Sequence, residues 1–208
     1  MLLTSVANIV EQLGFDPMTD VGFAVQTTLD AADAMLQSQL NTDFEMAAYV
    51  DTFYVRRPGL LDGPHMESEF RLSNGLVTSI VSVLVASQPG VFGTPSSATD
   101  VTANVIVEKD KGVVRDFTTP YSRQYVQITY TAGFNVDPTS GSPPTSYLLS
   151  EVPDWLQNAA RLMALIGVAD NAAITEAQIK LDTKTMGLQL SALLARKLRY
   201  APAALLPL

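Results

Sequence analysis

The residues that could do chemistry are few and scattered. His65 is the single histidine, and it lies in a segment rich in glycine and proline with no candidate nucleophile beside it. The absence of cysteine excludes a thiolate nucleophile, and one histidine with no cysteine excludes a zinc site of ordinary composition. A serine–histidine triad would have to use His65, and Ser73, Ser79 and Ser82 lie in strand-like sequence without a G-x-S-x-G motif. We therefore expect His65 to be a solvated surface residue.

Two further patterns are weak signals for ligand binding. Asp30 and Asp33 lie within one helical turn of each other, a spacing that suits Mg²⁺ or an acid–base pair, but no third ligand is near. The stretch "GVFGTPSS", residues 90–97, is rich in glycine but lacks the lysine and the strand-to-helix context of a phosphate-binding loop. Trp155, at the start of a helical stripe, is interpreted as a core anchor. We expect no catalytic residue, no cofactor and no metal.

Charge is unevenly distributed along the chain, whose net charge is −8. Residues 1–55 contain eight acidic residues and no lysine or arginine. From residue 180 onward there is one acid, Asp182, and five bases: Lys180, Lys184, Arg196, Lys197 and Arg199. Tight DNA binding depends on lysine and arginine displacing counterions, so the acidic segment is unsuited to gripping nucleic acid. The simplest interpretation of this segment is a solvated acidic face.

The composition predicts a foldable chain whose surface is poor in charge. Apolar residues make up 47% of the 208 residues and charged residues 16%, which indicates that part of the surface meets other protein chains. The N-terminus lacks the pattern of a signal peptide, and no apolar run approaches the ~20 residues that span a bilayer. We expect a soluble, cytoplasmic product with no membrane part.

Helical periodicity occurs at both ends of the chain. Residues 2–13 form a candidate short helix ended by Gly14, and Asp16-Pro17 predicts the start of a helix that continues to about residue 40. Pro153 opens a strongly amphipathic helix, and a last helix is predicted from Ile174 to Leu198.

The middle of the chain has the alternating pattern of strands. Strands are predicted at 48–57, 67–73, 76–86 and 123–133, with a tight Asn74-Gly75 turn after the second and a hairpin over 104–116 that turns at 110–112. Consecutive strands joined by turns favour antiparallel pairing. The predicted class is α+β: an N-terminal helix, a small antiparallel β-sheet with hairpins, and C-terminal helices packing with the first helix.

An ordered set of motifs resembles the head–tail connector proteins of long-tailed bacteriophages, also called adaptor or head-completion proteins. In that family a strand of the type V-x-V/I-x-Y-T-A-G-F/Y ends in a loop that leads to V-P-x-x-L/W-x-x-A at the start of a helix. The matching positions here are Val126, Ile128, Tyr130, Thr131, Ala132, Gly133 and Phe134, then Val152, Pro153, Trp155, Leu156 and Ala159. "FRLSNGLVTSIVSV" (70–83) and "VIVEKDKGVV" (105–114) look like further family segments in the same order.

The resemblance covers roughly residues 15–170, and it implies a role in assembly without covalent chemistry. We accordingly predict an adaptor-like domain over 1–170 and an extension over 171–208. The family forms a ring, usually of twelve subunits, beneath the portal protein at one capsid vertex. The ring extends the DNA channel and joins the head to a stopper or tail protein. DNA passes through without specific binding. The implied location is the neck of the virion, after assembly in the host cytoplasm.

Three groups of residues are predicted to contact neighbours. The apolar end of the chain, with Leu205, Leu206 and Leu208 close to Arg196, Lys197 and Arg199, is interpreted as an anchor on the portal or a neighbouring subunit; packing back on its own domain is an equal alternative. The loop stiffened by Pro138, Pro143 and Pro144 is predicted to dock on the tail side. Part of the set Asp16, Asp20, Asp30, Asp33 and Asp43 is predicted to face the channel and repel DNA.

Two other functions remain open from the sequence. A stopper or tail-terminator protein is the nearer alternative, although such proteins tend to have fewer helices than this chain. A small-ligand-binding protein or enzyme that uses residues 86–100 as a lid is the more distant alternative.

Overall fold

The structure, a computed structural model, describes residues 2–16, 20–40, 42–55, 68–88, 92, 98–116, 124–142, 145–169, 174 and 180–198, without the side chains of Ser68, Asp110 and residues 196–198. The chain divides into two compact units, one formed by Met1–Leu40 with Phe134–Tyr200 and the other by Asn41–Gly133. The first unit is helical and the second is built of antiparallel strands, which confirms the predicted α+β class. The predicted boundary at residue 170 stays a prediction.

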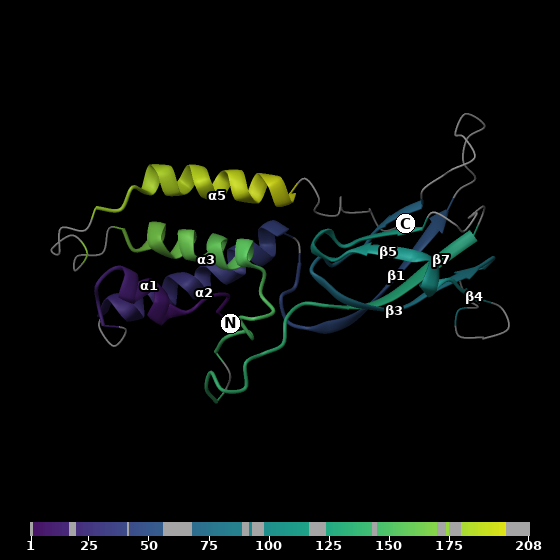
Figure 1. The fold of residues 1–208 in the computed structure, drawn as a ribbon, viewed down its shortest axis with the longest axis horizontal. Helices are drawn as coiled ribbons and strands as arrows, with labels where there is room; N and C mark the ends of the chain where they lie inside the picture. The colour runs from purple at the N-terminus through teal and green to yellow at the C-terminus, as the bar shows by residue number, and fades with distance from the viewer. Residues whose placement is uncertain are drawn as a thin grey trace. The chain divides into compact units, whose positions relative to one another are not determined.

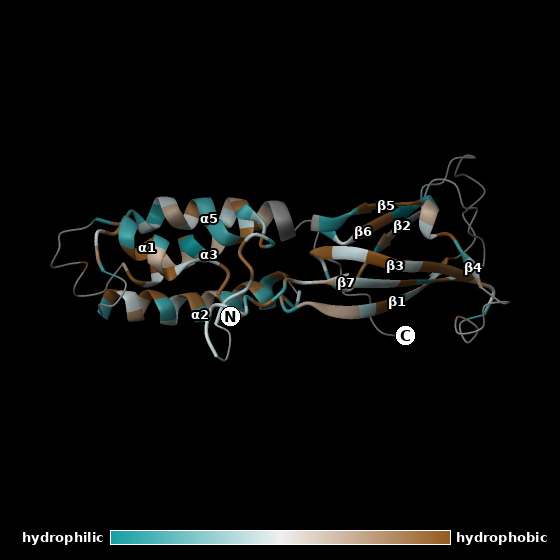
Figure 2. Cartoon of the chain, turned by 60° about the horizontal axis from the view of Figure 1, so that its bottom comes forward, coloured by the Kyte–Doolittle hydropathy of each residue, from teal (hydrophilic) through white to brown (hydrophobic). Residues whose placement is uncertain are grey.

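Within the helical unit, four helices are described: α1 (Val6–Gln12), α2 (Asp20–Leu40), α3 (Asp154–Gly167) and α5 (Thr183–Leu198). Helix α3 packs against both α2 and α5 and lies between them, as Figures 1 and 2 both show. The C-terminal helices therefore pack with the N-terminal helices, as predicted. Helices α2 and α3 approach closely where Gly167 meets the Thr28 side chain, because a Cβ at Gly167 would overlap Thr28 Cγ2. No helix in the described part of the chain is long and apolar enough to cross a membrane.

The ends of the C-terminal helices follow local capping chemistry. Pro153 is the N-cap residue of α3, and the Gln157 side chain donates to the carbonyl oxygens of Leu149 and Val152 at 2.9 Å each. The prediction of one continuous last helix from Ile174 to Leu198 is wrong: Ile174 is helical, but residues 180–182 are not, and α5 begins at Thr183. The Asp182 carboxylate accepts hydrogen bonds from the Thr185 amide (3.0 Å) and hydroxyl (2.6 Å). Asp182 thus satisfies helix-end donors that would lack partners, and it fixes the start of α5.

The strand unit contains two antiparallel sheets rather than one. The larger sheet has the order β1 (Ala47–Val55), β7 (Gln124–Ala132), β3 (Val77–Ala86) and β4 (Thr99–Asp100). The smaller sheet has the order β2 (Ser68–Arg71), β6 (Val113–Asp116) and β5 (Val105–Glu108). Strands β2 and β3 are consecutive in sequence but lie in different sheets, so the Asn74-Gly75 turn carries the chain from one sheet to the other.

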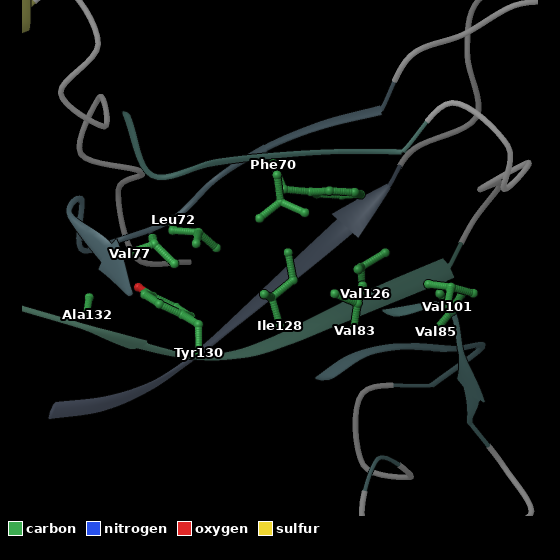
Figure 3. Packing of buried hydrophobic residues seen from close by; sticks show 11 residues of the cluster. Phe70, Leu72, Val77, Val83, Val85, Val101, Val126, Ile128, Tyr130 and Ala132 are labelled. Carbon is green, nitrogen blue, oxygen red and sulfur yellow. The ribbon is translucent and has the colours of Figure 1, made fainter. Parts of the chain in front are cut away.

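The two sheets share one hydrophobic core. Strand β7 is central in the larger sheet and points Val126, Ile128, Tyr130 and Ala132 inward, all fully buried. The smaller sheet contributes Phe70 and Val114, and the segment after β2 contributes Leu72. Figure 3 shows Phe70 and Leu72 facing the β7 side chains across the interior. Alternation with a period of two residues, visible in the sequence, therefore identifies the inner face of β7 correctly.

Gly133 ends β7 under a strict steric constraint. Its φ is +98°, in the region that side-chain-bearing residues rarely adopt, and a Cβ placed there would lie 2.5 Å from the Glu45 carbonyl oxygen. Its amide donates to Leu76 O (3.2 Å), and its carbonyl accepts from the Thr78 hydroxyl (3.0 Å). The strand can leave the sheet at this point only because residue 133 has no side chain.

We predict that Gly133→Ala destabilises the strand unit by about 2–5 kcal/mol, the sum of a left-handed backbone penalty and an overpacking penalty. Gly75→Ala is the matched control in the same unit, because a Cβ there meets only Thr42 Oγ1 at an ordinary 3.6 Å. It should change stability by less than about 1 kcal/mol. Urea unfolding followed by circular dichroism measures both, and equal effects of the two substitutions would contradict the steric account.

Candidate interaction surfaces

Among the described residues, the weak chemical signals of the sequence do not come together in a reaction centre. No group of three or more His, Asp or Glu side chains that could hold a metal ion occurs among the described residues. Asp30 is exposed on α2, whereas Asp33 is 5% exposed, and burial raises the pKa of Asp33. These two carboxylates therefore do not present a common face to a ligand. His65 and residues 93–97 of the glycine-rich stretch lie outside the described residues.

A cluster of hydrogen-bonded polar groups lies at one end of the hydrophobic core that the two sheets share. The Tyr130 hydroxyl donates to Asp51 Oδ2 at 3.0 Å, accepts from the Asn74 amide at 3.0 Å and lies 3.1 Å from Ser73 Oγ. Asp51 also accepts from the Ser73 amide (2.6 Å) and hydroxyl (2.7 Å). The cluster joins β1, β7 and the turn between β2 and β3.

This cluster is suited to holding a turn in place. Burial, with a contribution from the nearby Asp51 carboxylate, raises the pKa of Tyr130 to about 12, so its phenol stays protonated at neutral pH. Ser73 has a carboxylate beside it, but no histidine among the described residues is near it, and a carboxylate is a weak base toward a serine hydroxyl. The sequence reasoning missed this cluster. Its signal is Asp51, the one charged residue in a strand of aromatic and β-branched residues.

The predicted channel acids are distributed over both units. Asp16, Asp20 and Asp30 are exposed in the helical unit, and Asp43 is exposed in the strand unit. Asp33 is buried, so it does not contribute to an exposed acidic face. The channel-facing role of the four exposed carboxylates stays a prediction.

The proline-containing loop of the helical unit has an ordered base. Asp137 N donates to Ser146 O at 3.0 Å and Leu148 N to Asn135 O at 2.7 Å, so the two arms of the loop run side by side. Leu2 is hydrogen-bonded to the second arm through Thr145 O and Tyr147 N.

Side chains reinforce this base. Asn135 is bound through its amide and side chain to Glu151, at 2.8 and 3.0 Å, and the Phe134 and Tyr147 rings meet edge to face with centroids 5.9 Å apart. Pro138 is exposed beyond the base, whereas Pro143 and Pro144 lie outside the described residues. The structure thus describes a loop whose arms are fixed by contacts within its own unit.

The predicted C-terminal anchor lies mostly outside the described residues. Arg199, Leu205, Leu206 and Leu208 are not described, and Arg196 and Lys197 are placed only as backbone positions in the last turns of α5. Their role stays a prediction.

The outer faces of the two sheets differ in charge. On the smaller sheet Glu69, Arg71, Glu108 and Arg115 are exposed or half-buried and pair with one another, the N–O distances being 3.0 Å for Arg71–Glu69, 3.3 Å for Arg115–Glu69 and 2.8 Å for Arg115–Glu108. On the larger sheet, strands β1, β7 and β3 carry no charged residue on the outer face. That face contains Ala48, Val50, Thr52, Tyr54, Tyr125, Gln127, Thr129, Thr131, Ser79, Ser82 and Leu84. This uncharged face of mixed polar and apolar side chains, on which Val50 and Tyr54 are exposed, is compatible with contact to another chain because little charge must be desolvated.

Comparison with known proteins gives no family assignment. No protein-family model matches the chain, and no curated protein matches it. A chain in the structure "Neck of empty GTA particle computed with C6 symmetry" is 18% identical over 93% of this chain and 88% of that chain, with a TM-score of 0.44. A chain in "Virion of native gene transfer agent (GTA) particle" is 18% identical over 94% and 89%, with a TM-score of 0.42. At these values neither likeness carries an argument about function.

We predict that Tyr130→Phe costs about 1–3 kcal/mol of folding stability, because it leaves the Asn74 amide and the Asp51 carboxylate without the phenol. Tyr125→Phe, on the outer face of the same strand, should cost less.

The raised pKa of Tyr130 gives a second measurement. The Tyr130 phenol loses its proton near pH 10 in the unfolded chain and near pH 12 in the folded chain. The buried, protonated phenol therefore contributes to the free energy of unfolding below pH 10, and this contribution is lost as the pH rises from 10 to 12. Tyr130→Phe should flatten that loss, and an unchanged alkaline slope would contradict the assignment.

Proposed function

We propose that this chain is a structural protein of a virion neck, which forms a ring between the portal protein and the stopper or tail protein. The observation that carries the proposal is the ordered adaptor-like motif set. Its residues occupy positions where their chemical types are needed: Val126, Ile128 and Tyr130 in the core, Gly133 at the positive φ, and Pro153 at the helix start. A set of residues that each meet a structural requirement is less easily matched by chance than any one of these residues alone.

The distribution of charge supports the same proposal. A channel that conducts DNA should not hold it, and the exposed Asp16, Asp20, Asp30 and Asp43 come from a segment without any lysine or arginine. The ordered loop base supports a docking role for the loop tip, because a restrained loop loses less conformational entropy on binding. The helical unit favours an adaptor over a stopper or tail terminator.

Electron microscopy of virions that contain this chain, and of the purified chain with and without its portal protein, tests the proposal. We expect a ring of density at the collar between capsid and tail, and a ring on the portal in the mixture. A monomer in the absence of portal is compatible with the proposal, because the portal can act as a template for ring closure. Virions without density for the chain at the collar, or turnover of a substrate by the pure chain, would refute it.

The docking role of the loop can be tested without disturbing its base. Asp137 N and Ser146 O are 3.0 Å apart, so two glycines can replace residues 138–145 and still join the arms. We expect the trimmed chain to fold and to bind the portal, but to attach tail components at least about tenfold more weakly, a loss of about 1.4 kcal/mol. Replacing Pro138, Pro143 and Pro144 by alanine keeps the length and should give a smaller loss. Unchanged tail attachment by the trimmed chain would reject the docking role.

A further inference from the structure

The helical unit has two open flanks, on opposite sides of α3. Helix α3 is buried or half-buried along nearly its whole circumference, with only Asp154, Asn158 and Gly167 exposed. Its neighbours α2 and α5 lie on either side of it (Figures 1 and 2). Each of these outer helices buries one face toward the unit and leaves the opposite face exposed.

The open face of α2 is acidic and carries large apolar side chains. Phe23 is 64% exposed and Met35 is 51% exposed, although both are large hydrophobic residues. The small residues Ala31 and Ala34 are exposed on the same face between them. The helix has Asp20 and Asp30 exposed and contains no lysine or arginine.

Helix α5 is basic, and its open face carries one large apolar residue and two small ones. Leu188 is 65% exposed, and Ala192 and Ala195 follow it at helical spacing on the same exposed face. Helix α5 contains three basic residues, Lys184, Arg196 and Lys197, and no acidic residue. Lys184 is exposed, and so are Lys180 and Asp182 shortly before the helix.

We infer that α5 of one copy of this chain packs on α2 of the next copy, with Leu188 opposite the alanines of α2 and with Phe23 and Met35 opposite the alanines of α5. Large side chains set against small ones allow two helices to approach to the usual ~8–10 Å between axes. The occupant is a second copy because the two faces complement each other in charge, whereas α2 against α2 would oppose acids and α5 against α5 would oppose bases.

The position of the two flanks determines the kind of assembly. A contact between two different surfaces on opposite sides of one unit is heterologous, and repetition of such a contact gives a ring if it closes. The inference deepens the proposed function, and it rests on that function only for ring closure. The contact itself is a property of the purified chain.

Disulfide trapping tests the contact, because the natural chain contains no cysteine. Ala31→Cys places a thiol on the open face of α2 and Ala192→Cys places one on that of α5; both alanines are exposed. The two full-length variants, one enlarged by a tag, are mixed in equal amounts and oxidised. We expect the mixed disulfide to form at least about fivefold faster than either symmetric one, and a chain with both cysteines to form a ladder of oligomers.

Control variants separate a specific contact from random collision. Ile106→Cys, 57% exposed on β5, measures the collisional background. Phe23→Ser or Leu188→Ser, added to the corresponding chain, should slow the mixed disulfide at least about fivefold and leave the circular dichroism spectrum unchanged. Val50→Ser, at an exposed apolar residue on β1, should not slow it. High salt should slow the mixed reaction more than the background.

Two outcomes overturn the α2–α5 contact. In one, the mixed disulfide forms no faster than the Ile106→Cys background; in the other, a symmetric disulfide forms fastest. Trapping also detects weak contacts, so a chain that is monomeric by itself still gives a decisive result. Failure here together with collar density in virions would leave the proposed function standing with a different subunit contact. Success here without collar density would refute the proposed function alone.

Discussion

The backbone of Gly133 sets the condition on which the strand unit depends. Strand β7 lies between β1 and β3 and supplies the central residues of the core, so its register determines how both sheets meet. At its end the chain passes so close to Glu45 that no side chain fits, and the hydrogen bonds of Gly133 with Leu76 and Thr78 hold it there. A few residues earlier, the Tyr130 hydroxyl fixes the turn that joins the sheets. Steric exclusion and a buried polar cluster thus act at neighbouring points of one strand, where hydrophobic burial alone would not select a single backbone path.

Charge separates the described surfaces into three types. The smaller sheet has charges of both signs that pair with one another. Charged side chains of this kind keep a sheet in water and disfavour its association with other chains. The outer face of β1, β7 and β3 has no charge. The outer helices each carry a single sign of charge beside exposed apolar residues, acidic on α2 and basic on α5. Charge of one sign repels a copy of the same face and attracts a complementary one, so it encodes partner choice more than affinity.

Local patterns predicted the elements well, whereas contacts between distant segments remained hidden. Alternation identified β1 and β7, a nearly continuous apolar run identified β3, and Pro153 marked the start of α3, because these signals depend on neighbouring residues. The division of the strands between two sheets depends on pairings such as Phe70 with Val114, which a single sequence does not reveal. The break at residues 180–182 was not predicted, because helical spacing in the sequence continues through Asp182, whereas its carboxylate accepts hydrogen bonds from Thr185 at the start of α5. The exposure of Phe23 and Leu188 was equally hidden, since a hydrophobic residue in a helix is normally assigned to the core.

Asp20 and Asp30 link the two proposed roles of the acidic segment, because one carboxylate cannot both face a DNA channel and lie within a subunit contact. Both are on the open face of α2, beside Phe23 and Met35, where an approaching α5 helix would bring lysine and arginine close to them. A carboxylate paired in this way no longer presents its full charge to DNA. If α2 forms the lateral contact, repulsion of DNA would fall to exposed acids outside α2, of which Asp16 and Asp43 are the members of the predicted set. The exposed acids of the segment would then serve two purposes, with Asp20 and Asp30 on α2 selecting the neighbouring copy, and Asp16 and Asp43 repelling DNA.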